Sequence, residues 1–170
     1  MNDYLKGTLT GASLVLCIFM LGCPNNQSQD LGHITVKSIK VLNGEGEECF
    51  WVGSAPEGNG YLTVSNADGE LTAHLGGDAN GDGYLTTYNA DGKMTASLGT
   101  IGRDGFLQTF NADGKETASL GTGEGGVGYL RTFNKHEVET GYFGTNREND
   151  GMAILSDRYG DGGWYESGKK

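Results

Sequence analysis

Apolar and polar positions along this chain follow one local pattern that recurs many times. The segment from Tyr84 to Gly99 shows it clearly, with the letters YLTTY, then NADG, then KMTASLG. Aromatic and β-branched residues favour strands, and Asn, Asp and Gly favour turns. The segment therefore predicts two strands joined by a tight turn, and Gly99 ends the second strand.

The hairpin pattern is repeated with a nearly constant spacing. Four units align as GYLTVSNADGELTAHLG, GYLTTYNADGKMTASLG, GFLQTFNADGKETASLG and GYLRTFNKHEVETGYFG, and their aromatic residues (Tyr61, Tyr84, Phe106 and Tyr129) are 23, 22 and 23 positions apart. A degenerate unit precedes them, from Ser38 to Gly53, and a truncated unit follows from Met152. We therefore predict an all-β fold of tandem β-hairpin repeats of about 23 residues, forming an antiparallel sheet, meander or solenoid-like array.

The turn sequence also predicts a strand register. Asn89 suits the first position of a type I turn, and Gly92 suits the left-handed position after it, so residues 90–92 would form a three-residue loop. Asn89 would then face Lys93. The further expected pairs are Tyr88 with Met94, Thr86 with Ala96, and Tyr84 with Leu98. In the other units they are Tyr61 with Leu75, Phe106 with Leu120, and Tyr129 with Phe143.

This register predicts one face that is more apolar than the other, because side chains alternate between the faces of a strand. The apolar face would hold Tyr84, Thr86, Tyr88, Met94, Ala96 and Leu98, and the other face Leu85, Thr87, Thr95 and Ser97. A single hairpin is not stable alone, so the hairpins must stack. The array could wind as a solenoid, curl towards a barrel or pair with another chain. We expect a glycine-rich link between units and a changed turn at 135–137, where Lys-His-Glu replaces Ala-Asp-Gly.

Composition narrows the class of protein. The 170 residues include 31 glycines but only 2 prolines, without the triplet period of collagen, so glycine marks turns. The net charge of -10 disfavours binding to phosphate backbones, so no nucleic-acid partner is expected.

The N-terminal segment is typical of an export signal. From Gly7 to Gly22 no residue is charged, and these 16 residues are fewer than the roughly 20 that a membrane-spanning helix needs. The segment ends in Met20-Leu21-Gly22-Cys23, which resembles the lipobox of bacterial lipoproteins. The resemblance implies that Cys23 is lipidated and becomes the first mature residue. Met20 and Leu21 depart from the usual residues, and an uncleaved anchor helix or an ordinary signal peptide are the alternatives.

The lipoprotein resemblance sets an expected organisation. Residues 1–22 would be the signal peptide, residues 23–36 the lipidated cysteine with a flexible tether, and residues 37–170 the β-hairpin repeat domain. Pro24 follows the cysteine where the aspartate of inner-membrane retention would stand. The expected location is the bacterial cell envelope, with the chain lipid-anchored at the outer membrane or the cell surface.

The sequence shows no convergent catalytic site. His33, His74 and His136 fall in three different contexts, and Cys49 lies in a strand-like apolar run, which is typical of a small buried residue. There is no G-x-S-x-G elbow and no Cys/His cluster for zinc. We therefore expect a non-enzymatic protein that needs no cofactor.

One segment resembles the start of a calcium loop. Asp78, Asn80 and Asp82 supply oxygen atoms at alternate positions, and a glycine takes the sixth position. The twelfth position is Asn89 instead of the bidentate glutamate, and strands flank the loop. A weak calcium site and an ordinary polar turn are the two interpretations, and the turn is favoured.

The aromatic residues form a second candidate site. Tyr84, Tyr88, Phe106 and Phe110 recur at the repeat spacing and could stack on sugars, although packing against neighbouring strands is the favoured interpretation. The leading hypothesis is a cell-envelope lipoprotein with a structural or adhesive β-repeat array. The alternative is a surface-held ligand-binding module for glycans or calcium. Besides the membrane, an envelope protein, a glycan or another copy of the chain are the possible partners.

Overall fold

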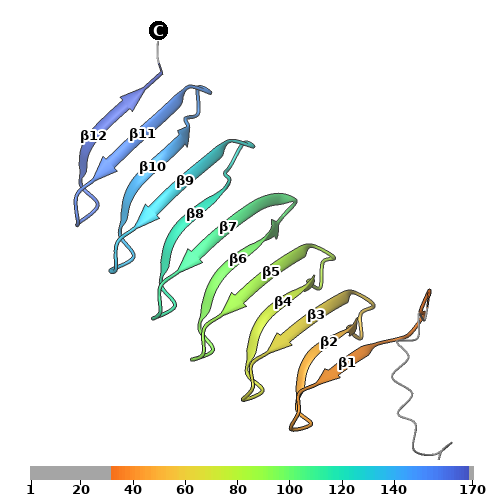
Figure 1. Cartoon of the computed structure of the whole chain (residues 1–170). Coiled ribbons are helices and arrows are strands. Elements are labelled where there is room, and N and C mark those ends of the chain that lie inside the picture. Colours follow the sequence, from red (N-terminus) through yellow and green to blue (C-terminus); the bar gives the residue numbers. More distant parts are fainter. Residues whose placement is uncertain (1–31, 169–170) are drawn as a thin grey trace, which may run out of the picture. The chain divides into compact units, whose positions relative to one another are not determined.

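The computed structural model describes residues 32–168. Contacts divide the chain into two units, residues 1–35 and 36–170, and all strands belong to the second. The described residues form no helix (Figure 1). The twelve strands are β1 (Ile39–Leu42), β2 (Glu48–Ser54), β3 (Gly60–Ser65), β4 (Leu71–Gly77), β5 (Gly83–Tyr88), β6 (Met94–Ile101), β7 (Asp104–Phe110), β8 (Glu116–Thr122), β9 (Gly128–Phe133), β10 (Glu139–Thr145), β11 (Gly151–Ser156) and β12 (Gly162–Ser167).

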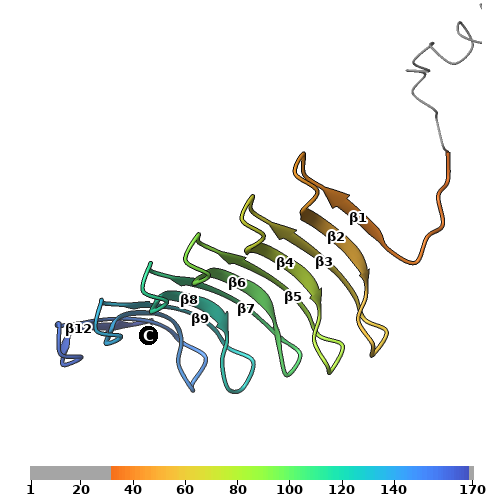
Figure 2. The same ribbon diagram turned by 90° about the horizontal axis from the view of Figure 1, so that it is seen from below.

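The strands form one antiparallel sheet in which every strand pairs with the next strand along the chain. The sheet order is therefore the sequence order, from β1 at one edge to β12 at the other, as Figures 1 and 2 show. This confirms the all-β fold of tandem hairpins and selects the meander. The degenerate first unit becomes β1 and β2, and the truncated last unit becomes β11 and β12.

The predicted three-residue loop at residues 90–92 is present. The Asn89 N–H donates to the Lys93 carbonyl at 2.9 Å, and the Gly92 N–H donates to the Asn89 carbonyl at 3.0 Å. Gly92 has a φ of 70°, in the left-handed region that glycine adopts without strain. The Asn89 Oδ1 also accepts the N–H groups of Asp91 and Lys93, at 3.1 and 2.9 Å. The asparagine therefore fixes the turn through both its backbone and its side chain.

The expected glycine-rich links are also tight hairpin turns. At residues 78–82 the Asp78 N–H donates to the Asp82 carbonyl at 2.8 Å, as Asn89 does to Lys93. The same bond joins Gly123 to Val127 and Asn146 to Asp150. The link at residues 101–104 is a two-residue turn instead, with positive φ at Gly102 and Arg103. It is one residue shorter, which explains why one repeat spacing is 22 and the others are 23.

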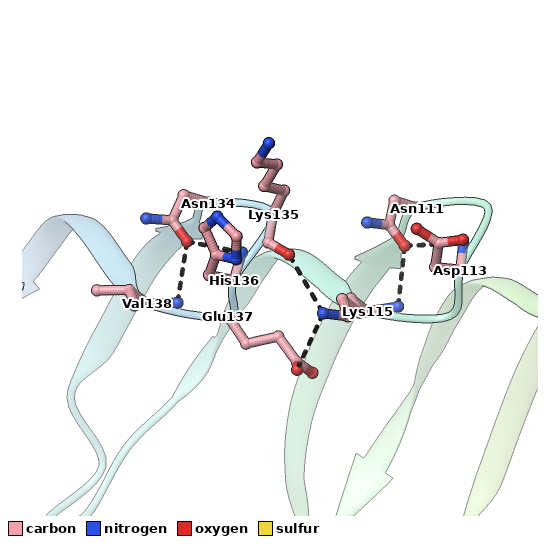
Figure 3. A network of polar contacts seen from close by, with 8 residues as sticks. All are labelled: Asn111, Asp113, Lys115, Asn134, Lys135, His136, Glu137 and Val138. Carbon is pink, nitrogen blue, oxygen red and sulfur yellow. Dashed lines mark hydrogen bonds and ion pairs between the residues drawn. The ribbon is translucent and has the colours of Figure 1, made fainter. Parts of the chain in front are cut away.

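The expected change of turn at residues 135–137 is wrong. Asn134 still makes the turn, because its Oδ1 accepts the N–H groups of His136 and Val138 at 2.9 and 3.2 Å (Figure 3). Glu137 takes the left-handed position with a φ of 62°, where the other units have glycine. The asparagine at the first position is therefore sufficient to keep the turn geometry, at the cost of a strained glutamate.

The predicted register holds only near the turn. Tyr88 pairs with Met94 as expected, but a β-bulge follows, so that Thr87 pairs with Ala96 and Thr95 is the extra residue. Beyond the bulge every predicted pair is displaced by one. Tyr84 lies opposite Gly99 instead of Leu98, and Thr86 lies opposite Ser97 instead of Ala96. The same displacement places Tyr61, Phe106 and Tyr129 opposite Gly76, Gly121 and Gly144.

The bulge therefore changes which side chains share a face. The predicted apolar face wrongly combined Tyr84 and Tyr88 with Ala96 and Leu98, because one extra residue reverses the alternation beyond it. We call one surface the aromatic face; it carries Trp51, Tyr61, His74, Tyr84, Tyr88, Phe106, Phe110, Tyr129, Arg131 and Tyr142, with the glycines opposite its rings. We call the other the leucine face; it carries Val52, Leu62, Leu75, Leu85, Leu98, Leu107, Leu120, Leu130 and Phe143, beside a row of Thr and Ala.

No apolar side chain among the described residues is fully buried. The most buried residues are polar: Thr86, Ser97 and Ser119 are only 5–7% exposed. All three lie on the aromatic face, between rows that carry rings. The sheet is thus a single layer that covers part of one face with its own side chains and leaves the other face open.

Candidate functional site

A row of four rings crosses strands β2 to β5 on the aromatic face. The ring centroids of Trp51 and Tyr61 are 4.3 Å apart, and the planes are tilted by 35°. His74 lies between two tyrosines, 5.5 Å from Tyr61 and 5.0 Å from Tyr84, with its plane nearly perpendicular to both. These distances and angles are those of favourable aromatic pairs. The row is a continuous aromatic surface contributed by four consecutive strands.

Glycines opposite the rings make this row possible. A Cβ atom on Gly76 would lie 2.6 Å from the Tyr61 Cβ, and one on Gly99 would lie 2.8 Å from the Tyr84 Cβ. A Cβ on Gly53 would lie 2.5 Å from the Trp51 ring. Such approaches are too close for any other residue. The recurrent glycine at the end of each second strand therefore provides the space in which a ring lies flat on the sheet.

The four ring residues predicted from the sequence all lie on the aromatic face. Tyr84 and Phe106 share a row and are separated by Gly99 on the strand between them. Tyr88 and Phe110 lie two rows nearer the asparagine turns, and the Thr86 hydroxyl donates to the Tyr88 oxygen at 3.2 Å. The structure thus places these residues on a common surface, but Tyr84 makes its ring contact with His74 and not with Phe106.

Sequence reasoning missed Trp51 and His74 as members of this surface, whereas Tyr61 was recognised as the aromatic residue of its unit. A signal was present, since His74, Ser97, Ser119 and Tyr142 occupy the same position in successive units. This position holds serine in the two central units and a ring, His74 or Tyr142, in the first and the last of the four units. The ends of the array therefore differ from its centre. The displaced register concealed this, because it assigned Ser97 to the opposite face.

Tyr84, the tyrosine at the β5 end of the row, has a pKa that differs from its ordinary value. Partial burial raises the pKa of Tyr84 above its ordinary value, and the negative charges of an ionised Tyr88 and of Asp78 raise it further. The neutral phenol is therefore the favoured form on the folded surface. A neutral hydroxyl can both donate and accept hydrogen bonds, as contact with a sugar requires.

A second cluster lies on the aromatic face at β9 and β10. The Arg131 guanidinium lies 4.5 Å from the Tyr129 ring centroid and 5.9 Å from that of Tyr142. Its Nε lies 3.6 Å from the Glu139 carboxylate, an ion pair that is too long for a hydrogen bond. Gln108 and Glu116 occupy the equivalent positions one unit earlier and form a hydrogen bond of 3.2 Å. The ion pair of Arg131 and Glu139 thus takes the place of the hydrogen bond between Gln108 and Glu116 in the preceding unit.

The candidate calcium segment forms one of the link turns. The Asp78 Oδ1 accepts the N–H groups of Asn80 and Asp82 at 2.8 and 2.9 Å, as the asparagines of the other turns do. Within residues 32–168 no three His, Cys, Asp or Glu side chains gather as a metal site would require. This geometry supports the polar turn. Calcium stays a prediction, which melting curves with calcium and with a chelator would test.

One surface hollow lies beside the link turns at residues 123–127 and 146–150. It is an open groove of about 790 Å³. Its charged and apolar lining includes Glu124, Arg147, Tyr142 and Met152. The groove is open to solvent. A groove of this kind does not enclose a small molecule.

The two cysteines of interest differ in position. Cys23, the predicted lipidation site, lies outside the described residues. Cys49 is half-buried on β2 at the bulge facing β1, and its thiol donates to the Val41 carbonyl at 3.4 Å.

Within the described part of the chain, no helix has the length and apolar character to cross a membrane. Comparison of the sequence with protein-family models and with curated proteins finds no match.

Proposed function

We propose that this chain is a lipid-anchored protein of the bacterial cell envelope, in which the β-repeat sheet serves as a non-enzymatic structural or adhesive element. The observation that carries the proposal is the succession of like hairpins directly after a segment that ends in a lipobox-like Cys23. Twelve strands at about 4.8 Å separation extend about 50 Å across the sheet. Such an array suits a spacer that holds a repeated surface away from the membrane.

Lipidation is tested on the whole chain expressed in a bacterial host. Metabolic labelling with an alkyne fatty acid should label the wild-type chain and the Cys17→Ser variant, and Cys23→Ser should lose the label. Mass spectrometry should find the lipid on an N-terminal peptide that begins at Cys23. Label that persists in Cys23→Ser, or a mature chain that begins elsewhere, would contradict the anchor.

The second candidate function is glycan binding by the aromatic face. The ring row from Trp51 to Tyr84 favours it, because all four rings are only half-buried and each contacts the next. Aromatic faces of this kind offer apolar area at low conformational cost. In this candidate function, Tyr84, Tyr88, Phe106 and Phe110 extend the same surface.

A glycan array probed with the wild-type chain and with Trp51→Ala tests this candidate. Tyr159→Ala is the matched control, since Tyr159 is 76% exposed in a turn and lies outside the row. Binding that is lost only in Trp51→Ala, with an unchanged circular dichroism spectrum, would favour the glycan-binding module. Equal binding by both variants would exclude the ring row as the binding surface.

A further inference from the structure

The leucine face presents a continuous apolar ladder. Each strand from β3 to β9 contributes one leucine, and each leucine lies directly opposite the next across the paired strands. The ladder consists of Leu62, Leu75, Leu85, Leu98, Leu107, Leu120 and Leu130. Val52 and Ile39 continue it towards β1, and Phe143 continues it on β10.

This ladder is exposed to solvent. Six of its leucines are 38–51% exposed, and Phe143 is 69% exposed. No other described segment lies over them, since the described strands form one sheet (Figure 2). Soluble monomers rarely leave a contiguous apolar surface of this length open. The ladder therefore has the character of an interface.

From β1 to β11 the leucine face lacks charge, and Glu166 on the edge strand β12 is its one charged strand residue. From β1 to β11 the strand residues that are charged at neutral pH, such as Lys40, Glu116 and Arg131, all point to the aromatic face. Beside the ladder, Thr and Ala alternate in the row Thr87, Ala96, Thr109 and Ala118. The chain carries a net charge of -10, but two copies meeting through this face would bring no like charges into contact. A charged partner would find no complementary group there.

The regular spacing of the ladder points to another copy as its occupant. Leucines recur at the strand separation of about 4.8 Å, and only a surface with the same period can interdigitate along the whole row. Eleven intervals between twelve strands span about 53 Å, and strands of six or seven residues are about 20 Å long. The resulting face of about 1,000 Å² exceeds the roughly 800 Å² per partner of a stable interface.

We propose that the leucine face is a self-association surface, against which a second copy of this chain packs sheet to sheet. Twisted sheets of the same hand pack in an aligned manner about 10 Å apart. Leu98 and Leu107 lie on β6 and β7, in the middle of the array, so a two-fold axis through the centre would place them beside their counterparts. The packing closes the face that the chain cannot cover itself.

The first experiment measures the association of the full-length chain, purified in mild detergent, by sedimentation equilibrium. The wild-type chain should associate, and the double variant Leu98→Glu/Leu107→Glu should dissociate at least about tenfold more readily. The matched control is Ala90→Glu/Ala112→Glu, which adds the same charge to two exposed turn positions. It should associate like the wild type. Loss of association in the control, or a monomeric wild-type chain, would overturn the proposal.

Mixing two variants of opposite charge distinguishes the loss of an interface from misfolding of the chain. The chain with Leu98→Lys/Leu107→Lys should not associate with itself, but mixing it with the double-glutamate chain should restore a mixed oligomer. The milder Leu98→Thr/Leu107→Thr variant keeps strand-forming residues and should also weaken association while its circular dichroism spectrum stays that of the wild type. Threonine variants that are folded and associate fully would overturn the proposal.

The Cys23→Ser variant separates this proposal from the lipid anchor. Association through the leucine face should persist without the lipid, because none of the residues involved lies near the N-terminal segment in sequence. Association that disappears with Cys23→Ser would show that lipid chains, and not the leucine face, hold the copies together. A missing lipid label with intact association would instead contradict only the anchor.

Discussion

The two faces of the sheet are built from the same repeat, but they differ in how far their side chains are covered. On the aromatic face, rings alternate with glycines, so that each ring has an empty position to lie over and covers its polar neighbours. On the leucine face, a leucine stands opposite a leucine on strand after strand, and there is no recess into which one could fold. Side chains of the same chain partly cover the aromatic face, whereas only another molecule can cover the leucine face.

This difference shows where burial comes from in a single layer. A sheet without a second layer has no interior, and the most buried residues are Thr86, Ser97 and Ser119 on the aromatic face. Their burial depends on which side chains lie beside them on the neighbouring strands. Glycine is thus a structural residue of the aromatic face, and its absence from the ladder explains why the leucines stay exposed.

The largest expected effect comes from filling the space under a ring. Gly99→Val would place a Cβ 2.8 Å from that of Tyr84 and 3.1 Å from the Gly83 carbonyl oxygen. We expect a loss of about 3 kcal/mol in the free energy of unfolding, as overpacking causes. Urea unfolding followed by circular dichroism measures it.

The matched control for that substitution is Gly105→Val on the neighbouring strand. Gly105 lies opposite Thr100 on the leucine face, and a Cβ there meets nothing closer than a carbonyl oxygen at 4.0 Å. The free energy of unfolding should change by no more than about 0.5 kcal/mol. Equal losses for the two variants would show that the faces do not differ in this respect.

A second comparison removes one side chain from each face of the same strand. Tyr84→Ala should reduce the free energy of unfolding by about 2 kcal/mol, less than for a fully buried ring, because Tyr84 is half-buried and contacts His74. Leu85→Ala, measured in dilute protein, should cost less, because Leu85 is 38% exposed. A larger loss for Leu85→Ala in dilute protein would indicate that the leucine face is already covered within one chain.

The sequence was sufficient to predict the hairpins, and insufficient to predict which residues share a face. Asn89 and Gly92 act locally, so their turn could be predicted from four letters. The bulge at Thr95 depends on both strands at once, and the 2.9 Å contact between the Thr87 and Thr95 hydroxyls forms only after they pair. Because alternation has a period of two, that single extra residue moved Ala96 and Leu98 to the opposite face.

The same reason explains what could be predicted of the candidate surface. The recurrence of Tyr84 and Phe106 identified a row of rings, but the partners of these rings required the correct register. His74 differs from Ser97 at an equivalent position, and its place between two tyrosines follows only once Gly76 and Gly99 are known to lie opposite them. The links were predicted only as glycine-rich segments, and the structure shows that Asp78 and Asn146 make the same turn as Asn89.

A substitution in a turn should change the free energy of unfolding without changing how the aromatic face and the leucine face differ. Glu137→Gly should raise the free energy of unfolding by about 1 kcal/mol, because glycine adopts the left-handed conformation without strain. The ion pair with Lys115, at 4.0 Å and exposed, contributes little to stability (Figure 3). Asn149→Gly is the control and should gain less, since asparagine tolerates a positive φ. A change in self-association on Glu137→Gly would show that the turns, too, take part in the interface.

The smallest expected effect is a dependence on alkaline pH that belongs to the aromatic face. Burial, followed by the charges of Tyr88 and Asp78, raises the pKa of Tyr84 above its ordinary value of 10.0. The unfolded chain then loses this proton at a lower pH than the folded chain does. The resulting contribution to stability is fully present below the ordinary pKa and is lost as the pH rises through the raised one.

The urea midpoint of the wild-type chain should therefore fall more between about pH 9 and about pH 11 than that of Tyr84→Phe. Tyr165→Phe is the control, because Tyr165 is 57% exposed on β12 and should leave the dependence unchanged. The leucine ladder cannot contribute, because the side chains of Leu, Val, Ile and Phe carry no titratable group. Parallel curves for the wild type and Tyr84→Phe would mean that the ring of Tyr84 is hydrated in solution, and that the aromatic face is as open as the leucine face.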